Sequence, residues 1–138
     1  MKEKFIQAHM QAAYVYASLS SCERRKVGCV IVKDNSIIAI GYNGTPKGEC
    51  NCCEDENGNT KPEVIHAEDN ALRKLTGSTN NGIGASAFVT LCPCILCAPR
   101  IIDAGITHVY YSEVYHNEDG LNHLLKNGVK VTKVTKEE

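Results

Sequence analysis

The sequence predicts a mixed α/β fold in which helices cover both faces of a five-stranded sheet. Short β-branched apolar runs predict the strands, and segments with helical spacing alternate with them in the second half of the chain. One helix and a strand hairpin precede this alternating part. Strands that alternate with helices are typical of sheets covered on both faces.

Length and composition predict one domain over residues 1–138. A chain of 138 residues is long enough to bury a core, and 43% hydrophobic with 22% charged residues is ordinary for a globular protein. The net charge of −1 includes no basic stripe, so we expect no nucleic-acid partner. No apolar run near the N-terminus suits a signal peptide or a membrane span. We therefore expect a cytoplasmic protein, in the host cytoplasm if a phage encodes it, with no membrane contact.

The first half of the chain predicts a helix followed by a hairpin. Residues 2–19 carry apolar side chains at helical spacing. The run VGCVIV at 27–32 is almost continuously apolar, as in strands buried on both faces, and includes Cys29 as a core residue. A turn at 34–36 leads into the partner strand at 37–40.

The second half begins with a long loop over residues 41–63, rich in Gly, Asn, Pro and acidic residues. Long loops in compact domains are usually functional. Periodicity and turn residues then predict these elements in order: helix 65–75, strand 86–91, helix 93–104, strand 106–114, helix 119–126 and strand 129–134.

Pro99 fits this scheme badly because it falls inside the predicted helix 93–104. A proline in a helix interior loses a backbone hydrogen bond and crowds the preceding turn, at a cost of about 3 kcal/mol. We expect a kink or a loosened first turn there.

Two short motifs carry the chemistry: His66-Ala67-Glu68 and Pro93-Cys94-Ile95-Leu96-Cys97. One imidazole and two thiolates are donors that zinc accepts, and three protein ligands leave its fourth position open for water. Glu68 can stand beside that water as an acid/base group without binding the metal. H-x-E followed later by P-C-x-x-C is the signature of zinc-dependent nucleobase deaminases.

A purely structural zinc is the alternative, since each motif alone is weak evidence. Such a site favours four protein ligands and has no use for Glu68. The two motifs together, in this order, favour a catalytic site.

The segments HAEDNAL, PCILC, VGCVIV and GYNGTPKG together resemble the deoxycytidylate (dCMP) deaminase family, in its compact bacterial and phage form, within the cytidine deaminase superfamily. The resemblance runs from about Ser20 to the last strand. It implies a cytidine-deaminase-like three-layer α/β/α fold. It also implies a hydrolase of pyrimidine nucleotide biosynthesis that converts dCMP to dUMP and ammonia, supplying the precursor of dTMP.

The resemblance implies a role for each motif residue. His66, Cys94 and Cys97 would hold Zn²⁺. Glu68 would take a proton from the attacking water, protonate N3 of cytosine and pass a proton to the leaving ammonia. The backbone amide of Ala67 would contact the base carbonyl.

Substrate contacts outside the motifs are also implied. By resemblance Asn43 lies at the sugar hydroxyl, although an Asn-Gly pair is equally a turn signal. A guanidinium can grip a phosphate in two places, which favours Arg24 for the phosphate, with Ser20 and Tyr115 as helpers. A solvated surface charge is the alternative for Arg24.

The resemblance further implies a homohexamer that is activated by dCTP with Mg²⁺ and inhibited by dTTP. The regulatory nucleotide would lie against the loop at a subunit interface. The residues implied for it are Tyr42, Asn43, Gly44, Lys47 and Gly48.

Eight cysteines are many for this length, and without a secretory signal they favour metal ligands or free thiols over disulfides. Phage-type family members can carry a second, structural zinc, for which Cys22, Cys52, Cys53 and Glu63 are candidate donors. The segment between Cys53 and His66 lacks the histidine expected there, so free thiols are the default prediction. Cys92 lies next to the metal motif.

Two other functions fit the same zinc motif. A tRNA-adenosine or other polynucleotide deaminase would need a basic surface, which the balanced charge disfavours. A catalytically silent nucleotide-sensing module would not need an intact Glu68. A nucleoside deaminase is disfavoured because such enzymes usually have a cysteine where His66 stands.

Overall fold

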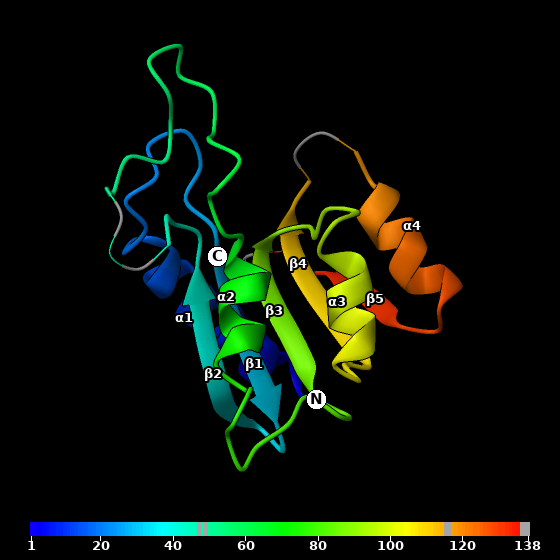
Figure 1. Ribbon diagram of the computed structural model, residues 1–138. Helices are drawn as coiled ribbons and strands as arrows, with labels where there is room; N and C mark the ends of the chain where they lie inside the picture. The colour runs from blue at the N-terminus through cyan, green and yellow to red at the C-terminus, as the bar shows by residue number, and fades with distance from the viewer. Residues whose placement is uncertain (47, 49, 115–116, 136–138) are drawn as a thin grey trace.

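The computed structural model describes residues 1–46, 48, 50–114 and 117–135, and its central feature is a mixed five-stranded sheet (Figure 1). The strand order is β2-β1-β3-β4-β5, with β1 antiparallel to β2 and β3, and β3, β4 and β5 mutually parallel. This confirms the predicted sheet. The elements are α1 (Glu3–Ala17), β1 (Gly28–Lys33), β2 (Ser36–Tyr42), α2 (Ala67–Arg73), β3 (Ser86–Leu91), α3 (Ala98–Asp103), β4 (His108–Glu113), α4 (Asp119–Lys126) and β5 (Lys130–Lys133).

Helices cover both faces of the sheet because the central strands are apolar on both sides. On one face Val30 of β1 and Phe88 of β3 pack against Met10 of α1. On the other face the alternate strand residues pack against α2, α3 and α4, for example Ile31 against Ala71. Residues i and i+1 of a strand point to opposite faces, so the continuous run at 27–32 serves both layers. The three-layer α/β/α fold is confirmed.

The hairpin turn between β1 and β2 is built by Asp34 and Asn35, both with positive φ (52° and 62°). Two residues with positive φ match the right-handed twist of a tight hairpin, and Asp and Asn tolerate this conformation. The second strand is longer than predicted and continues to Tyr42.

The long loop is irregular, as predicted, and two isolated bridges organise it. Gly44 pairs with Ile65, and Glu54 pairs with Thr60. Among the described residues, no helix has the length and apolar content needed to cross a membrane.

The helix that carries Pro99 differs from the prediction. It begins at Ala98 rather than at Pro93, so Pro99 stands in its first turn. The amide nitrogens of a helix's first turn have no partner within the helix, so a proline there forfeits nothing. Of the two expectations, the kink was wrong and the loosened first turn is confirmed, because residues 95–97 form turns where the prediction had the start of the helix.

Candidate metal centre

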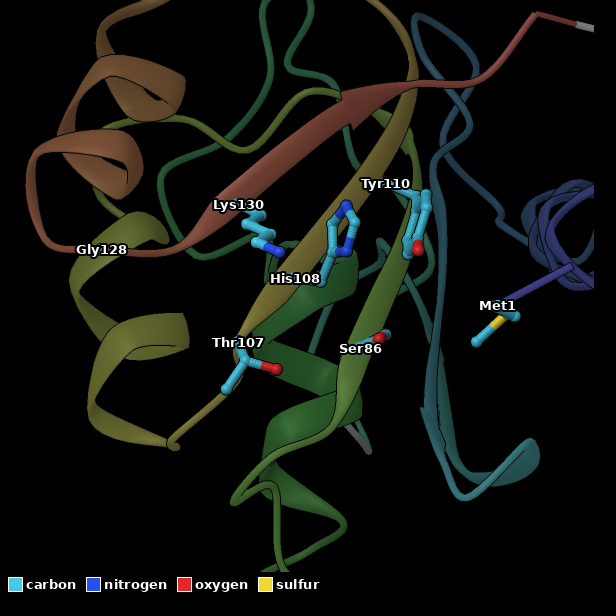
Figure 2. A pocket seen from close by; sticks show the side chains of 7 residues that line it. All are labelled: Met1, Ser86, Thr107, His108, Tyr110, Gly128 and Lys130. Carbon is cyan, nitrogen blue, oxygen red and sulfur yellow. The ribbon is translucent and has the colours of Figure 1, made fainter. Parts of the chain in front are cut away.

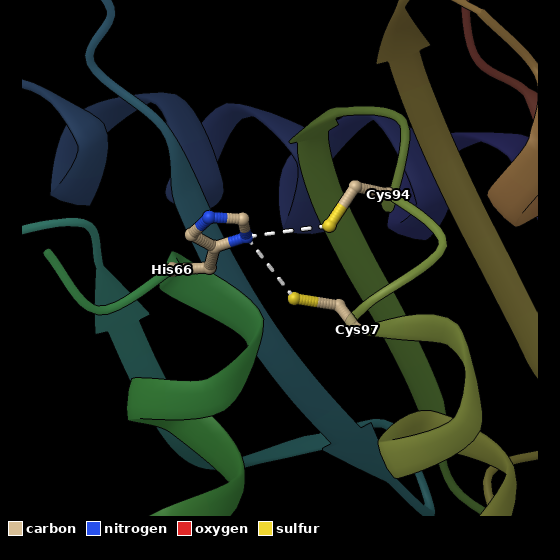
Figure 3. A group of neighbouring side chains, drawn as sticks. All are labelled: His66, Cys94 and Cys97. Atoms are coloured by element: carbon tan, nitrogen blue, oxygen red, sulfur yellow. Dashed lines mark hydrogen bonds between the residues drawn. The ribbon is translucent and has the colours of Figure 1, made fainter. Parts of the chain in front are cut away.

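The two motifs meet at the end of the sheet where α2 and α3 begin (Figure 3). His66 Nδ1 lies 3.2 Å from Cys97 Sγ and 3.4 Å from Cys94 Sγ. The ligand atoms of all three side chains lie within 4.8 Å of one another, and no other group of three such residues occurs in the described part of the chain. We call these three residues the metal cluster.

Each member of the metal cluster is held at the end of an element. His66 is the N-cap of α2 and Cys97 is the N-cap of α3, and neither side chain bonds to its own helix. Cys94 lies in the turn that follows β3, where its carbonyl accepts hydrogen bonds from the amides of Cys97 and Ala98. All three side chains therefore point into one space.

Two glycines allow the elements around the metal cluster to approach closely. A Cβ atom on Gly41 of β2 would overlap the Ala67 carbonyl at the start of α2. A Cβ atom on Gly120 of α4 would overlap the Pro93 carbonyl, directly before Cys94. Because real Cβ atoms cannot occupy these positions, both sites require glycine.

The donor set fits zinc by its chemistry. Zinc is borderline-soft, and one imidazole with two thiolates leaves an open position in a tetrahedral site. Cys97 is buried, Cys94 is half-buried and His66 is exposed, so the cluster is reachable from solvent on one side. These three residues could hold a zinc ion with access for a small molecule.

The three side chains of the metal cluster lie close enough to shift one another's pKa values. A hydrogen bond from the Cys97 thiol lowers the pKa of Cys94, and the same bond and burial raise the pKa of Cys97. The hydrogen bond with Cys94 raises the pKa of His66. Cys94 is thus the readier thiolate, and a metal ion would displace the remaining protons.

Glu68 lies in the first turn of α2, beside the cluster. Its side chain is buried, and burial raises its pKa to about 7. A carboxyl group that titrates near neutrality can both accept and release a proton, as an acid/base catalyst must. Ala67, between Glu68 and His66, is fully buried.

Asn43 has a structural role that the sequence did not reveal. Its carboxamide oxygen accepts a hydrogen bond from the Val27 amide (2.9 Å), and its nitrogen donates to the Arg25 carbonyl (2.8 Å). The Ser20 hydroxyl donates to the Asn43 carbonyl (2.7 Å). Asn43 and Ser20 thus attach segment 20–27 to the start of the long loop.

Arg24 is exposed, and Glu54 fixes its backbone. The two carboxylate oxygens of Glu54 accept hydrogen bonds from the amides of Glu23 (3.2 Å) and Arg24 (3.1 Å). Sequence reasoning missed Glu54, because nothing in an acidic loop distinguishes one carboxylate from its neighbours. Tyr115, the other predicted phosphate contact, lies outside the described residues.

The residues predicted for a regulatory nucleotide lie along one stretch of the loop. The Tyr42 carbonyl accepts a hydrogen bond from Asn70 (2.8 Å), and Gly44 pairs with Ile65. Gly48 is exposed, with φ of 90°. Lys47 lies outside the described residues.

The loop cysteines differ from the prediction of free thiols. Cys22 is joined to Cys53, and Cys50 to Cys52, by disulfides. Among the described residues, the predicted second-metal donors Cys22, Cys52, Cys53 and Glu63 form no group of three ligand atoms. The resemblance had grouped Cys22 with Cys52 and Cys53 as candidate donors to one metal, and the structure does bring Cys22 to Cys53, but as a disulfide.

The two other non-motif cysteines, Cys29 and Cys92, belong to neither disulfide. Cys29 and Cys92 are both buried, and Cys29 lies in the core as predicted. Cys92 donates to the Asn117 carbonyl (3.8 Å) rather than joining the metal cluster.

A separate pocket of about 390 Å³ opens at the other end of β4 and shares no residue with the metal cluster (Figure 2). The rings of His108 and Tyr110 stack in it with centroids 3.9 Å apart, and Lys130 lies beside them. Its remaining lining residues are Met1, Ser86, Thr107 and Gly128.

Comparison with known proteins shows the family to which this chain belongs. Residues 3–113, which include both motifs, match the cytidine and deoxycytidylate deaminase zinc-binding region. The chain belongs to this family. The deaminase family assignment agrees with the geometry of the metal cluster, because both halves of the cluster lie inside the matched region.

Individual deaminases resemble the chain along most of its length. A crystal structure of the cyanophage S-TIM5 dCMP deaminase in complex with dCMP and dUMP superposes with a TM-score of 0.94 at 44% identity, over 97% of this chain and 99% of that one. The deoxycytidylate deaminase of Saccharomyces cerevisiae is 36% identical over 92% of this chain. That of enterobacteria phage T4 is 33% identical over 92% of this chain.

The relatives differ in length. The chain spans 43% of the yeast protein and 88% of the phage T4 protein. The compact cyanophage enzyme is the relative of matching size among these three.

Proposed function

We propose that this protein deaminates dCMP to dUMP and ammonia by hydrolysis at a zinc centre. The observation that carries the proposal is the metal cluster of His66, Cys94 and Cys97, with a buried carboxyl group of pKa about 7 on the adjoining helix turn. The cyanophage relative, whose structure contains dCMP and dUMP, supports the choice of substrate.

The metal cluster would hold the zinc ion, which on binding supplies Lewis-acid activation of the attacking water. Glu68 then moves the protons. Its carboxylate takes one from the water and delivers it to N3 of cytosine as the new bond to C4 forms. It then carries a second proton to the exocyclic nitrogen, the C4–N bond breaks, and ammonia leaves. Water is consumed, and the base becomes uracil.

Burial suits Glu68 to this shuttle. In water a glutamate titrates near 4.3 and would return a proton poorly at neutral pH. With burial raising the pKa of Glu68 to about 7, the proton affinity of the carboxylate suits both steps.

Binding of the nucleotide would use residues around the metal cluster. We assign the base carbonyl to the Ala67 amide, the deoxyribose hydroxyl to Asn43 and the phosphate to Arg24, with Ser20 and Tyr115 assisting. The supporting observation is that Ser20, Arg24 and Asn43 belong to segments joined by direct hydrogen bonds.

Regulation is part of the same proposal. We assign activation by dCTP with Mg²⁺ and inhibition by dTTP to the loop from Tyr42 to Gly48, in a homohexamer. Positive φ at Gly48 and the exposure of this residue suit close approach of a phosphate to the backbone.

The test is ammonia release from dCMP by the zinc-loaded protein, with and without dCTP and Mg²⁺. We expect turnover that Glu68→Gln abolishes, and little turnover of deoxycytidine, which lacks the phosphate. Zinc bound without turnover of dCMP would overturn the proposal. A tRNA substrate assayed in parallel distinguishes a polynucleotide deaminase, and inactivity on both substrates points to a silent nucleotide-sensing module.

A further inference from the structure

Asp69 accepts ion pairs from two arginines on different helices. Its Oδ2 atom lies 3.0 Å from the Arg73 guanidinium, one turn later on α2, and 2.9 Å from the Arg100 guanidinium on α3. The Asp69 side chain is 13% exposed, against 59% for Arg73 and 56% for Arg100. One carboxylate, mostly removed from solvent, therefore bridges the two helices.

The bridge lies one turn from the metal cluster on both sides. Asp69 follows His66 and Glu68 on α2, and Arg100 follows Cys97 on α3. The Asp69–Arg100 pair therefore spans the same gap between helices as the contact between His66 and Cys97. A change in the distance between the helices at this pair would move the ligands at the metal cluster too.

Both helices need such a connection because they are short. α2 has 7 residues and α3 has 6, lengths at which an isolated helix does not hold its shape. Each helix also buries few apolar side chains, Ala67 and Ala71 on α2 and Ala98 and Ile101 on α3, and apolar packing is not directional. An ion pair with defined geometry adds the directional restraint that such packing lacks.

We propose that Arg100 and Asp69 are positioning residues that set the spacing between His66 and Cys97 and thereby the affinity of the cluster for zinc. The inference rests on the proposed function only in that the cluster holds zinc. Arg73 shares the same carboxylate, but it lies on α2 and connects no second helix.

A matched set of variants separates positioning from ordinary surface pairing. Arg73→Ala removes an exposed pair within α2 and leaves the Asp69–Arg100 pair between the helices in place, so zinc affinity should stay within about twofold of the parent. Arg100→Ala should weaken zinc affinity by about three- to tenfold. This is less than the loss of about 10- to 100-fold that is typical when a group that directly orients a metal ligand is removed.

The experiment measures zinc dissociation constants by chelator competition for the parent, Arg100→Ala, Arg73→Ala, Asp69→Asn and the double variant Asp69→Asn/Arg100→Ala. We expect the double variant to be no weaker than the worse single variant, because both remove one interaction. The absorption spectrum of the cobalt-substituted protein reports ligand geometry directly, and it should change in Arg100→Ala but not in Arg73→Ala.

Equal zinc affinity and equal cobalt spectra for Arg100→Ala and Arg73→Ala would overturn the inference. Additive losses in the double variant would overturn it as well. Arg100→Lys, which keeps the charge without the planar fork, should lose part of the affinity and serves if Arg100→Ala folds poorly. A parent protein that binds no zinc would instead overturn the proposed function.

Discussion

The metal cluster and the segments around the proposed nucleotide site are built in different ways. The metal cluster stands at the starts of two helices and the end of a central strand, elements that the sheet and core hold in place. The described residues of segments 20–27 and 43–65 form no helix or strand. Side chains and cross-links hold these two segments together: Asn43, Glu54 and the Cys22–Cys53 disulfide.

We expect this difference to separate the residues that carry out the reaction from those that recognise the nucleotide. A metal site tolerates little displacement of its ligand atoms. The metal cluster meets this requirement because helix ends and close backbone packing hold its residues in place. Nucleotide recognition depends on which groups line an irregular loop, and such loops accept change without disturbing the core. Substitutions in the two regions should therefore have different signatures: loss of metal or turnover in one, loss of substrate affinity in the other.

The largest effect is expected from Glu68→Gln. The amide keeps the shape of the side chain but cannot carry protons, so kcat should fall by about 10²- to 10⁴-fold. Zinc content should stay at the parental level, because Glu68 is not among the ligands. Parallel measurement of metal content and ammonia release checks both, and retained activity would refute the assigned role.

The next effect is expected from Gly120→Ala. The added methyl group would overlap the Pro93 carbonyl and push apart α4 and the turn that carries Cys94. Overpacking of this kind costs about 1–3 kcal/mol of stability and should weaken zinc binding. Gly44→Ala is the matched control, because a Cβ there meets nothing within 4 Å. Urea unfolding and chelator competition measure the two effects, and equal results for both variants would contradict this prediction.

A smaller effect, confined to substrate binding, is expected from Asn43→Ala. The variant loses two hydrogen bonds that hold Arg25 and Val27. We expect KM for dCMP to rise roughly tenfold, the equivalent of one or two such bonds, with zinc affinity unchanged. Asn51→Ala, at an exposed position of the same loop, is the control. Loss of zinc from Asn43→Ala would break the separation between the two regions.

The smallest effect concerns His108, away from both regions. Burial and the Lys130 ammonium lower the pKa of His108 from its usual value near 6.5. As pH falls below that value, the unfolded chain takes up this proton before the folded protein does. Stability is therefore retained above pH 6.5 and lost as pH falls towards the lower folded-state pKa. Urea unfolding between pH 5 and 8 should show a weaker pH dependence in both His108→Gln and Lys130→Gln.

The sequence predicted those parts of the molecule in which apolar residues recur at a regular spacing or residue types form a known motif. Strand runs such as 27–32 and 86–91 have a simple burial pattern, and the sheet followed from them. The three residues of the metal cluster were recognisable because their residue types and order match a known chemistry. The start of α3 was misplaced, because Pro93 is also a good first residue of a helix and local preference could not reveal the turns after it.

Contacts between irregular segments were beyond prediction. The hydrogen bonds of Asn43 and Glu54 join segments that are distant in sequence and have no regular pairing pattern. The ion pair between Asp69 and Arg100 belongs to the same class, since only the packing of α2 beside α3 brings the two residues together. The resemblance grouped Cys22 with Cys53, but as metal donors and not as the disulfide that the structure has.

The N-cap positions of α2 and α3 have a consequence for protein engineering. Their side chains, His66 and Cys97, face each other instead of capping the helices. Serine, threonine or aspartate at an N-cap typically adds about 1 kcal/mol of stability. A search for stabilising substitutions would therefore favour replacing both residues, and the more robust protein it produced would have lost its site. Thermal robustness is the wrong criterion at these two positions.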